Sequence, residues 1–305
     1  MSGHFADELT LRVRELGHPL CVGLDPHLAH IPPLFRRGSM RPADPETADV
    51  VEAFVSAVVE RVAPGVAIVK PQIAFFEQLG WRGLRALERV VARALGAGCK
   101  VLLDAKRGDI GSTAEGYARA YLEPESPLAV DAITLNPYLG RDTLTPFAER
   151  ARLHGRGLFI LTKTSNPGSG DYQDRELADD DAPLFESVAA SLCELSDALS
   201  GVETGWSSLG VVVGATYPGQ AESVRANLPH ALFLVPGYGA QGASAKDAVR
   251  GFVPGPAGLE GGIIASSRAI LFPKDSDTND ATTWEKAIDR ALESAINELA
   301  NAITS

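Results

Sequence analysis

The sequence predicts an α/β protein folded as a closed (β/α)₈ barrel, and two observations lead to this prediction. First, short runs rich in Val, Ile and Leu alternate with longer amphipathic segments along the whole chain, as expected when helices cover buried parallel strands. Second, there are eight such runs, and no linker between them is long enough to separate two domains. We therefore expect residues 1–305 to form a single TIM-barrel domain.

The predicted elements alternate between strand and helix. A helix over residues 5–16 is expected to cover the bottom of the barrel. The last helix is expected to begin with a capping box at Thr282-Thr283-Trp284-Glu285 and to continue with apolar residues at helical spacing. The eight strands are predicted at residues 20–24, 66–70, 100–105, 131–135, 157–162, 209–214, 231–236 and 262–266. Amphipathic segments are predicted at 50–63, 76–97, 141–153, 183–200 and 217–227.

Composition and charge argue against several classes of partner. The formal net charge of −11 disfavours nucleic acid and anionic membranes, but a locally positive pocket can still bind a small anion. No apolar run is long enough to span a membrane, and the N-terminus does not resemble a signal peptide. Cys21, Cys99 and Cys193 show no pairing pattern, which indicates buried, reduced thiols. We expect a cytoplasmic protein.

Two connections are longer than usual for a barrel. Residues 25–48 follow the first strand and are rich in proline, whereas residues 164–182 follow the fifth strand and contain six acidic residues. A long polar loop at the catalytic end of a barrel is typical of an active-site lid, so we expect 164–182 to be one. A disordered insert is the alternative.

Charged residues stand where three predicted strands end. These are Asp25 after the first strand, Lys70 at the end of the second, and Asp104 and Lys106 at the end of the third. Because side chains alternate along a strand, Asp104 and Lys106 should project to one side while Ala105 points toward the helices. A structural ion-pair network is the alternative, but burying several charges is costly. The pattern therefore favours a functional site at the barrel mouth.

The C-terminal third of the chain predicts an anion site. The seventh strand runs into the glycine-rich segment 236–242, which includes Gln241, and the eighth strand runs into Arg268. The loops after these two strands usually bind phosphate in barrel enzymes, because backbone amides and a forked guanidinium can reach its oxygens. Tight turns next to a surface arginine are the alternative.

Two further motifs do not predict a cofactor. Residues 237–242 fit G-x-G-x-x-G, but only one strand follows them, whereas a dinucleotide site needs a complete βαβ unit and a suitably placed acid; Glu260 does not convincingly end a strand. His27 and His30 form H-x-x-H, but no further ligand has the spacing of a metal site. We expect the protein to use no cofactor and no metal.

The strand-end residues are similar to those of a known family. Lys70-Pro71-Gln72-Ile73-Ala74-Phe75-Phe76-Glu77 and Asp104-Ala105-Lys106-Arg107-Gly108-Asp109-Ile110-Gly111-Ser112-Thr113, together with the loops after strands seven and eight, resemble the longer bacterial orotidine 5′-phosphate decarboxylases. The likeness covers essentially the whole chain. It implies decarboxylation of orotidine 5′-monophosphate to uridine monophosphate, the last step of de novo pyrimidine nucleotide synthesis, without a cofactor.

The resemblance also implies a role for each matching residue. Lys70, Asp104, Lys106 and Asp109 match the alternating catalytic Lys-Asp-Lys-Asp array of the family. In that family the last Asp acts in the partner subunit's site, so a homodimer is implied, with Asp109, Ile110 and Thr113 acting in trans. The remaining matches are substrate ligands: Asp25 and Thr113 for the ribose, Ser165 for the pyrimidine edge, and Gln241 and Arg268 for the phosphate.

The expected mechanism is electrostatic. Loss of CO₂ from C6 leaves a carbanion that the ring delocalises poorly, so a fixed ammonium beside C6 would stabilise it. Lys106 is the candidate for this ammonium and for the proton donor. Three alternatives are considered: a Mg²⁺-dependent sugar-phosphate decarboxylase, which resembles a family with an acid where Lys70 stands; a Schiff-base aldolase using Lys70, Lys106 or Lys163; and a non-catalytic phosphate-binding barrel.

Overall fold

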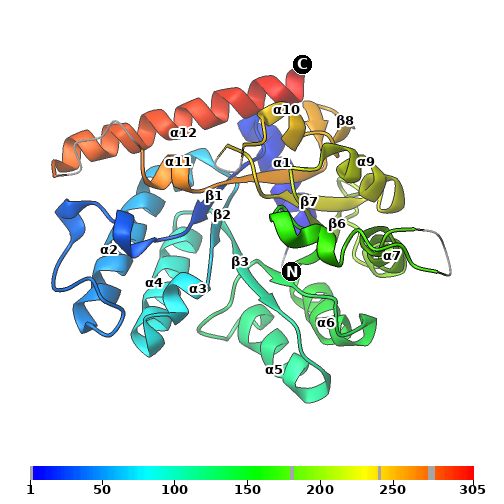
Figure 1. Ribbon diagram of the computed structural model, residues 1–305, viewed down its shortest axis with the longest axis horizontal. Helices are drawn as coiled ribbons and strands as arrows, with labels where there is room; N and C mark the ends of the chain where they lie inside the picture. Colours follow the sequence, from blue (N-terminus) through cyan, green and yellow to red (C-terminus); the bar gives the residue numbers. More distant parts are fainter. Residues whose placement is uncertain (1–2, 179–181, 240–241, 274–278) are drawn as a thin grey trace.

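The computed structural model describes residues 3–178, 182–239, 242–273 and 279–305, and its centre is a closed parallel barrel (Figure 1). The strands follow the order β1-β10-β7-β6-β5-β4-β3-β2, and β2 pairs again with β1. The predicted (β/α)₈ barrel is therefore confirmed. The barrel strands are β1 (Leu20–Leu24), β2 (Ile68–Pro71), β3 (Lys100–Arg107), β4 (Ala132–Leu135), β5 (Gly157–Lys163), β6 (Ser207–Val213), β7 (Ala231–Val235) and β10 (Gly262–Ser266).

Each predicted strand is present, with ends that differ by at most two residues from the predicted ones. Their apolar side chains are divided between two packed clusters. One cluster fills the space between the strands and the outer helices, and the other fills the barrel interior. Burial on both faces explains why the strands read as continuous apolar runs rather than as an alternating pattern.

The helices form a ring around the barrel, and Figure 1 shows α12 lying along its outside. The predicted segment 76–97 divides into α3 and α4 at Gly80, whose φ of 65° is a left-handed conformation. The predicted segment 183–200 likewise divides, into α7 and α8. The α-helices are α1 (Phe5–Leu16), α2 (Pro45–Val62), α3 (Ala74–Glu77), α4 (Gly80–Gly96), α5 (Gly111–Leu122), α6 (Thr145–His154), α7 (Leu184–Ser191), α8 (Cys193–Asp197), α9 (Pro218–Asn227), α10 (Ala245–Ala248), α11 (Arg268–Leu271) and α12 (Ala281–Thr304).

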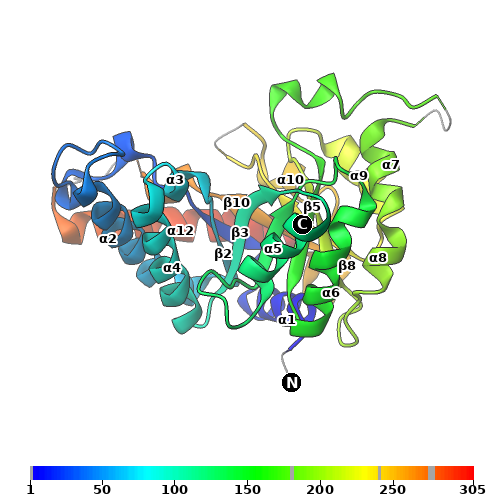
Figure 2. The same ribbon diagram turned by 90° about the horizontal axis from the view of Figure 1, so that it is seen from below.

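Helix α1 covers the bottom of the barrel, as predicted, on the side opposite the loop that follows β5 (Figure 2). Phe5 of α1 is buried and its ring meets that of Phe159 edge to face, with centroids 6.2 Å apart. The Asp7 carboxylate accepts hydrogen bonds from the Thr204 amide at 2.9 Å and the Thr204 hydroxyl at 2.7 Å. These contacts attach the helix to the loop before β6.

The predicted capping box at Thr282-Thr283-Trp284-Glu285 is wrong. Helix α12 begins one residue earlier, at Ala281, and its cap is Asp280. The Asp280 carboxylate accepts a hydrogen bond from the Thr283 amide at 2.7 Å. An aspartate is at least as good an N-cap as a threonine and its charge favours the helix N-terminus, so the acidic residue just upstream caps the helix instead.

The connections add elements that the sequence patterns did not predict. Strands β8 (Val253–Gly255) and β9 (Gly258–Glu260) form a small antiparallel hairpin between β7 and β10. Glu260 pairs there with Arg14 of α1, which gives this acid a structural contact. The connections also contain the short 3₁₀ helices η1 (Leu28–His30), η2 (Pro33–Phe35), η3 (Ala63–Gly65), η4 (Arg141–Leu144) and η5 (Pro167–Asp171).

The structure also bears on the expectations for the cysteines and for membrane-spanning segments. The three cysteines are free; Cys21 and Cys99 are buried, as expected, while Cys193 is partly exposed. In the part of the chain that the structure describes, no helix is both long and apolar enough to cross a membrane.

Candidate active site

A cavity of about 670 Å³ opens at the carboxyl ends of the strands. This is the size of a pocket for a small ligand. Its walls come from residues far apart in the sequence, which only closure of the barrel brings together. Charged and polar lining residues are Asp25, His27, Lys70, Gln72, Asp104, Lys106, Thr164, Ser165, Asn166, Tyr238, Ser267 and Arg268.

The alternation of side chains along the strands places these groups. Cys21, Ile68 and Leu102 point into the barrel, where they pack in the interior cluster. Residues two and four positions further along the same strands face the same side. This register brings Lys70 and Asp104 to the mouth, and Asp25 follows directly after β1. The apolar lower layer of the barrel thus positions a polar upper layer.

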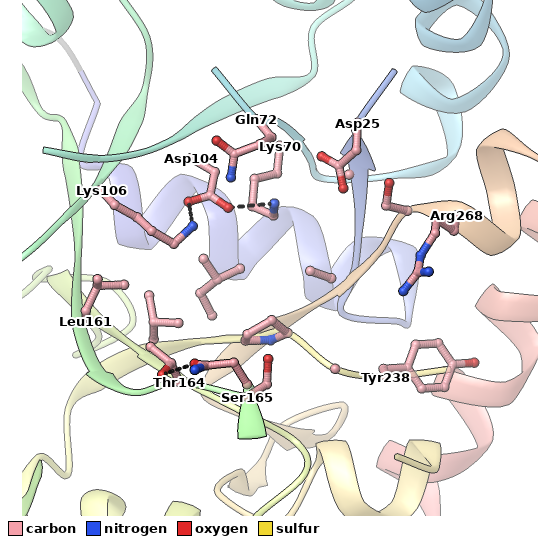
Figure 3. A pocket seen from close by; sticks show the side chains of 18 of the residues that line it. Asp25, Lys70, Gln72, Asp104, Lys106, Leu161, Thr164, Ser165, Tyr238 and Arg268 are labelled. Atoms are coloured by element: carbon pink, nitrogen blue, oxygen red, sulfur yellow. Dashed lines mark hydrogen bonds and ion pairs between the residues drawn. The ribbon is translucent and has the colours of Figure 1, made fainter. Parts of the chain in front are cut away.

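Lys70, Asp104 and Lys106 form a continuous charged array, as Figure 3 shows. The Lys70 ammonium lies 3.1 Å from Oδ2 of Asp104, and the Lys106 ammonium lies 2.5 Å from Oδ1. Lys70 and Asp104 are buried, whereas Lys106 lines the cavity with a side chain that is 44% exposed. Of the two ammonium groups, Lys106 is therefore the one that a ligand can approach more freely.

The array fixes the charge state of its buried members. Burial alone would raise the pKa of Asp104, but the ammonium groups of Lys70 and Lys106 outweigh that effect and hold the pKa well below its ordinary value. Burial alone would lower the pKa of Lys70, but Asp104 and Asp25 reverse the effect and raise it. At neutral pH Asp104 is a carboxylate and Lys70 an ammonium, so Lys70 is unsuited to form a Schiff base.

The other end of the cavity carries Asp25 and Arg268. In Figure 3, Asp25 lies between Lys70 and Arg268, and Arg268 extends into the cavity near Tyr238. Oδ1 of Asp25 and Oγ of Ser267 are buried and lack a hydrogen-bond partner among the described residues. Unpaired buried oxygens are rare in proteins, so both atoms are suited to receive or donate a hydrogen bond to a ligand.

Ser165 lines the cavity at the start of the loop after β5. The loop folds back on its own beginning: Gln173 accepts a hydrogen bond from the Thr164 amide at 2.9 Å and donates one to the Thr164 hydroxyl at 2.8 Å. The fully buried Lys163 does not line the cavity; its ammonium lies 2.7 Å from Asp174 of the same loop. Lys163 therefore anchors the loop, and its position does not suit the Schiff-base alternative.

Three predicted site residues do not line this cavity, and a fourth lies outside the described residues. Asp109, Ile110 and Thr113 do not line the cavity of their own chain; they lie on the rim after β3, where the Ile110 side chain is 61% exposed. Gln241 lies outside the described residues. The other six predicted residues, Asp25, Lys70, Asp104, Lys106, Ser165 and Arg268, share the cavity.

Sequence reasoning missed several residues of the site. His27, considered only as a metal ligand, lines the cavity and packs edge-on against Phe75, with ring centroids 4.4 Å apart. Gln72 belongs to a segment that resembles the family, but no role was predicted for it. It lies two residues after Lys70 and so faces the same side. Ser267 precedes Arg268 and could have been found in the same way. Strand alternation was the available signal for both Gln72 and Ser267.

Comparison with known proteins agrees with this arrangement. The model of the orotidine 5′-phosphate decarboxylase / HUMPS family matches residues 18–281. The chain belongs to this family. A Rhodopirellula baltica orotidine 5′-phosphate decarboxylase is 42% identical over 96% of this chain and 98% of its own length. The Deinococcus radiodurans protein of the same name is 40% identical over 97% of this chain and 99% of its own.

A solved structure extends the likeness to three dimensions. The Leishmania donovani OMP decarboxylase superposes with a TM-score of 0.74 at 34% identity and covers 99% of both chains. Membership in the orotidine 5′-phosphate decarboxylase family, with relatives that match over nearly their full length, agrees with the resemblance found in the sequence. The charged array at the mouth is thus the part of the fold where the chemistry is to be sought.

Proposed function

We propose that this protein decarboxylates orotidine 5′-monophosphate to uridine monophosphate and CO₂ in pyrimidine nucleotide synthesis. The observation that carries the proposal is the Lys70–Asp104–Lys106 array facing a cavity whose other end holds Arg268. A nucleoside monophosphate matches this arrangement, with an anion at one end and a reactive ring at the other. The relatives that match this protein over nearly their full length carry the name of this activity.

Lys106 performs the central step in this proposal. The bond between C6 and the carboxylate breaks, its electron pair remains on C6, and CO₂ departs. At about 4 Å and an effective dielectric constant near 20, an ammonium and a carbanion attract each other by roughly 4 kcal/mol. The Lys106 ammonium then transfers a proton to C6 to give the product, and the amine recovers a proton from water. No cofactor or metal is needed for this step.

Asp104 and Lys70 prepare the site for that step. The pKa of Asp104 is low, so it remains charged and repels the substrate carboxylate, a repulsion that ends when CO₂ leaves. Asp104 also holds the Lys106 ammonium at 2.5 Å. Lys70 neutralises the second oxygen of Asp104, and we assign it, together with Asp25, to the ribose. The interaction of the array with the substrate therefore becomes more favourable as the reaction proceeds.

The phosphate contributes binding energy at a distance from the ring. Arg268 can fork onto two phosphate oxygens, and we assign Gln241 to the same group. Ser165 is assigned to the pyrimidine edge, and residues 164–182 to a lid over the ring. Charge-assisted contacts of about 1.5–3 kcal/mol each would hold the lid closed and so contribute to the transition state indirectly.

We propose that the working unit is a homodimer, located in the cytoplasm. Asp109, Ile110 and Thr113 would complete the site of the partner subunit, where Asp109 would favour the ammonium form of Lys106. The exposure of Ile110 at the rim supports this, as does that of Tyr138 and Leu139 after β4, which are 86% and 48% exposed. Apolar side chains exposed together on one rim are typical of an interface.

Subunit complementation tests the action in trans. Lys106→Ala and Asp109→Ala should each be nearly inactive alone. If Asp109 acts in the partner's site, a mixed dimer contains one intact site, so an equal mixture should recover about a quarter of wild-type activity. A mixture that exchanges subunits, shown by mass spectrometry of differently tagged chains, yet stays inactive would contradict the proposal.

An ultraviolet assay of orotidine 5′-monophosphate consumption tests the activity itself. Wild-type protein should turn the substrate over at an undiminished rate in excess EDTA. Loss of activity with the chelator would indicate a metal-dependent decarboxylase. Trapping of a covalent adduct by borohydride with a carbonyl substrate would indicate an aldolase, and binding of the nucleotide without turnover would indicate a binding protein.

A further inference from the structure

One buried hydroxyl is bonded entirely to the catalytic segment of β3. Thr134 lies in β4, is completely buried, and does not line the cavity. Its Oγ1 accepts hydrogen bonds from the backbone amides of Ala105 and Lys106, both at 2.9 Å. The same hydroxyl donates to Oδ1 of Asp104, also at 2.9 Å. A hydroxyl has one donor and two acceptor sites, so Thr134 uses its whole hydrogen-bonding capacity on three consecutive residues.

The backbone that Thr134 holds is irregular. The pairing of β3 with β4 shifts between Leu103, opposite Ile133, and Arg107, opposite Leu135, so β3 advances four residues while β4 advances two. Within this bulge Lys106 has a φ of 48°. Among the described residues, only Lys106 and Met40 have a positive φ without being glycine. A lysine adopts this conformation only where its surroundings fix it.

The bulge changes where the Lys106 ammonium lies. On a regular strand Asp104 and Lys106 would project in parallel, and their charged ends would not necessarily meet. Here the ammonium lies 2.5 Å from Oδ1 of Asp104, the same oxygen that Thr134 contacts. Thr134 thus fixes both ends of the pair: the carboxylate of Asp104 directly and the backbone of Lys106 through its amide.

We propose that Thr134 is a positioning residue for decarboxylation, which sets the bulge and thereby the place of the Lys106 ammonium relative to the reacting carbon. This inference rests on the function proposed above. A purely apolar residue would suit this position as far as packing is concerned, because Ala132, two residues earlier and therefore on the same face of β4, is completely buried in the interior cluster. The hydroxyl is explained by its bonds to β3.

The test compares Thr134→Val, which keeps the side-chain shape, with Thr134→Ser, which keeps the hydroxyl. Thr162→Val is the matched control, because Thr162 is also buried in a barrel strand, but its hydroxyl donates to the Ile160 carbonyl of its own strand, at 3.3 Å, rather than to a neighbouring strand. Steady-state kinetics with orotidine 5′-monophosphate and equilibrium binding of uridine monophosphate would be measured for each. Circular dichroism would show whether each variant is folded.

The expected result is a loss in kcat that is not matched in binding. Thr134→Val should lower kcat about 30- to 100-fold, since a displacement of around 1 Å can cost that much. Its KM and its affinity for uridine monophosphate should change less than about threefold, because the phosphate and ribose contacts are untouched. Thr134→Ser should restore kcat to within about fivefold of wild type, and Thr162→Val should match wild type.

Several outcomes would overturn the inference. A folded Thr134→Val with wild-type kcat would show that the hydroxyl is unnecessary, and a Thr134→Ser as slow as the valine variant would show that the methyl group matters instead. A parallel loss of nucleotide affinity would indicate a general structural role. If Thr134→Val does not fold, Thr134→Ala is read by the same criteria. Inactive wild-type protein would instead refute the proposed function, so the two failures are distinguishable.

Discussion

Two carboxylates at opposite ends of the barrel, Asp7 and Asp25, differ in their hydrogen bonding. At the bottom, Asp7 accepts hydrogen bonds from the amide and hydroxyl of Thr204 and from the amide of Glu203. At the mouth, Oδ1 of Asp25 is buried with no hydrogen-bond partner among the described residues, although Lys70 is close enough to feel its charge. One carboxylate is satisfied by the protein, and the other is left available.

This difference distinguishes a structural end from a functional end. Hydrogen bonds to a charged group stabilise a fold, whereas a buried polar atom without a partner destabilises it. Asp25 therefore gives up stability that a bound substrate can restore, and Asp7 does not. It follows that substitutions at the mouth should affect catalysis more than folding, and substitutions at the bottom should do the reverse.

The largest expected effect outside the lysine array is at Asp25. Asp25→Ala should lower kcat/KM about 100-fold or more, because a charged hydrogen-bond acceptor for the ribose is lost. Its free energy of unfolding, measured in urea, should stay within about 1 kcal/mol of wild type, since Oδ1 of Asp25 has no hydrogen-bond partner among the described residues. A strongly destabilised Asp25→Ala variant with normal kcat/KM would show that Asp25 has a structural role, like Asp7.

Asp7→Ala should show the opposite pattern. We expect a loss of about 2–3 kcal/mol in the free energy of unfolding, because the variant loses charge-assisted hydrogen bonds that attach α1. Activity at a temperature well below the unfolding transition should be unchanged. Reduced kcat in a fully folded Asp7→Ala would argue against the separation of the two ends.

The Asp7 contribution should depend on pH in a defined direction. Burial alone would raise the pKa of Asp7, but its hydrogen bonds outweigh burial, so the pKa is lowered from its ordinary value of 3.8. A carboxylate with a lowered pKa stabilises the fold above its unfolded-state pKa, and this contribution disappears as pH falls through the folded-state value. The stability difference between wild type and Asp7→Ala should therefore be constant from pH 7 to about 5 and shrink below about 4. A difference that grows on acidification would contradict the assignment.

A smaller effect is expected from crowding Ser165. A Cβ atom added to Gly214 would lie 2.8 Å from both Cα and Cβ of Ser165, so Gly214→Ala must displace the residue assigned to the pyrimidine edge. We expect KM to rise about tenfold, in line with the loss of one hydrogen bond. Gly219→Ala, where the new atom meets nothing within 4 Å, is the control and should leave KM unchanged. Equal KM values for the two variants would show that Ser165 does not contact the substrate.

The sequence predicted the barrel well because its signals are local. Each strand is a short apolar run, and the alternation of side chains correctly placed Lys70 and Asp104 at the mouth, although the bulge in β3 sets where the Lys106 ammonium lies. Asp25 was found because it immediately follows β1, and Arg268 because it lies two residues after the end of β10. The roles of Asp109, Ile110 and Thr113 came only from the family resemblance, since a single chain does not show what its partner contributes.

The features that could not be predicted depend on the register between neighbouring strands and on competition between two candidate helix caps. Thr134 matters because a bulge in β3 places three residues opposite it, and no local pattern announces that shift. Lys163 falls away from the cavity because the pairing of β5 with β6 also shifts, between Leu161 and Lys163. The helix cap was misplaced because Asp280 and Thr282 are both good caps, and the charged Asp280 caps the helix in the structure.

The most direct test of the account compares the two lysines at opposite ends of β3. Lys106 lies at the mouth, and Lys100 lies at the start of the strand, where it pairs with Glu8 of α1. Lys106→Ala should lower kcat by at least about 1000-fold, the equivalent of roughly 4 kcal/mol, with no comparable loss of stability. Lys100→Ala should keep wild-type kcat. A Lys106→Ala variant within tenfold of wild-type kcat would contradict the claim that this ammonium stabilises the carbanion.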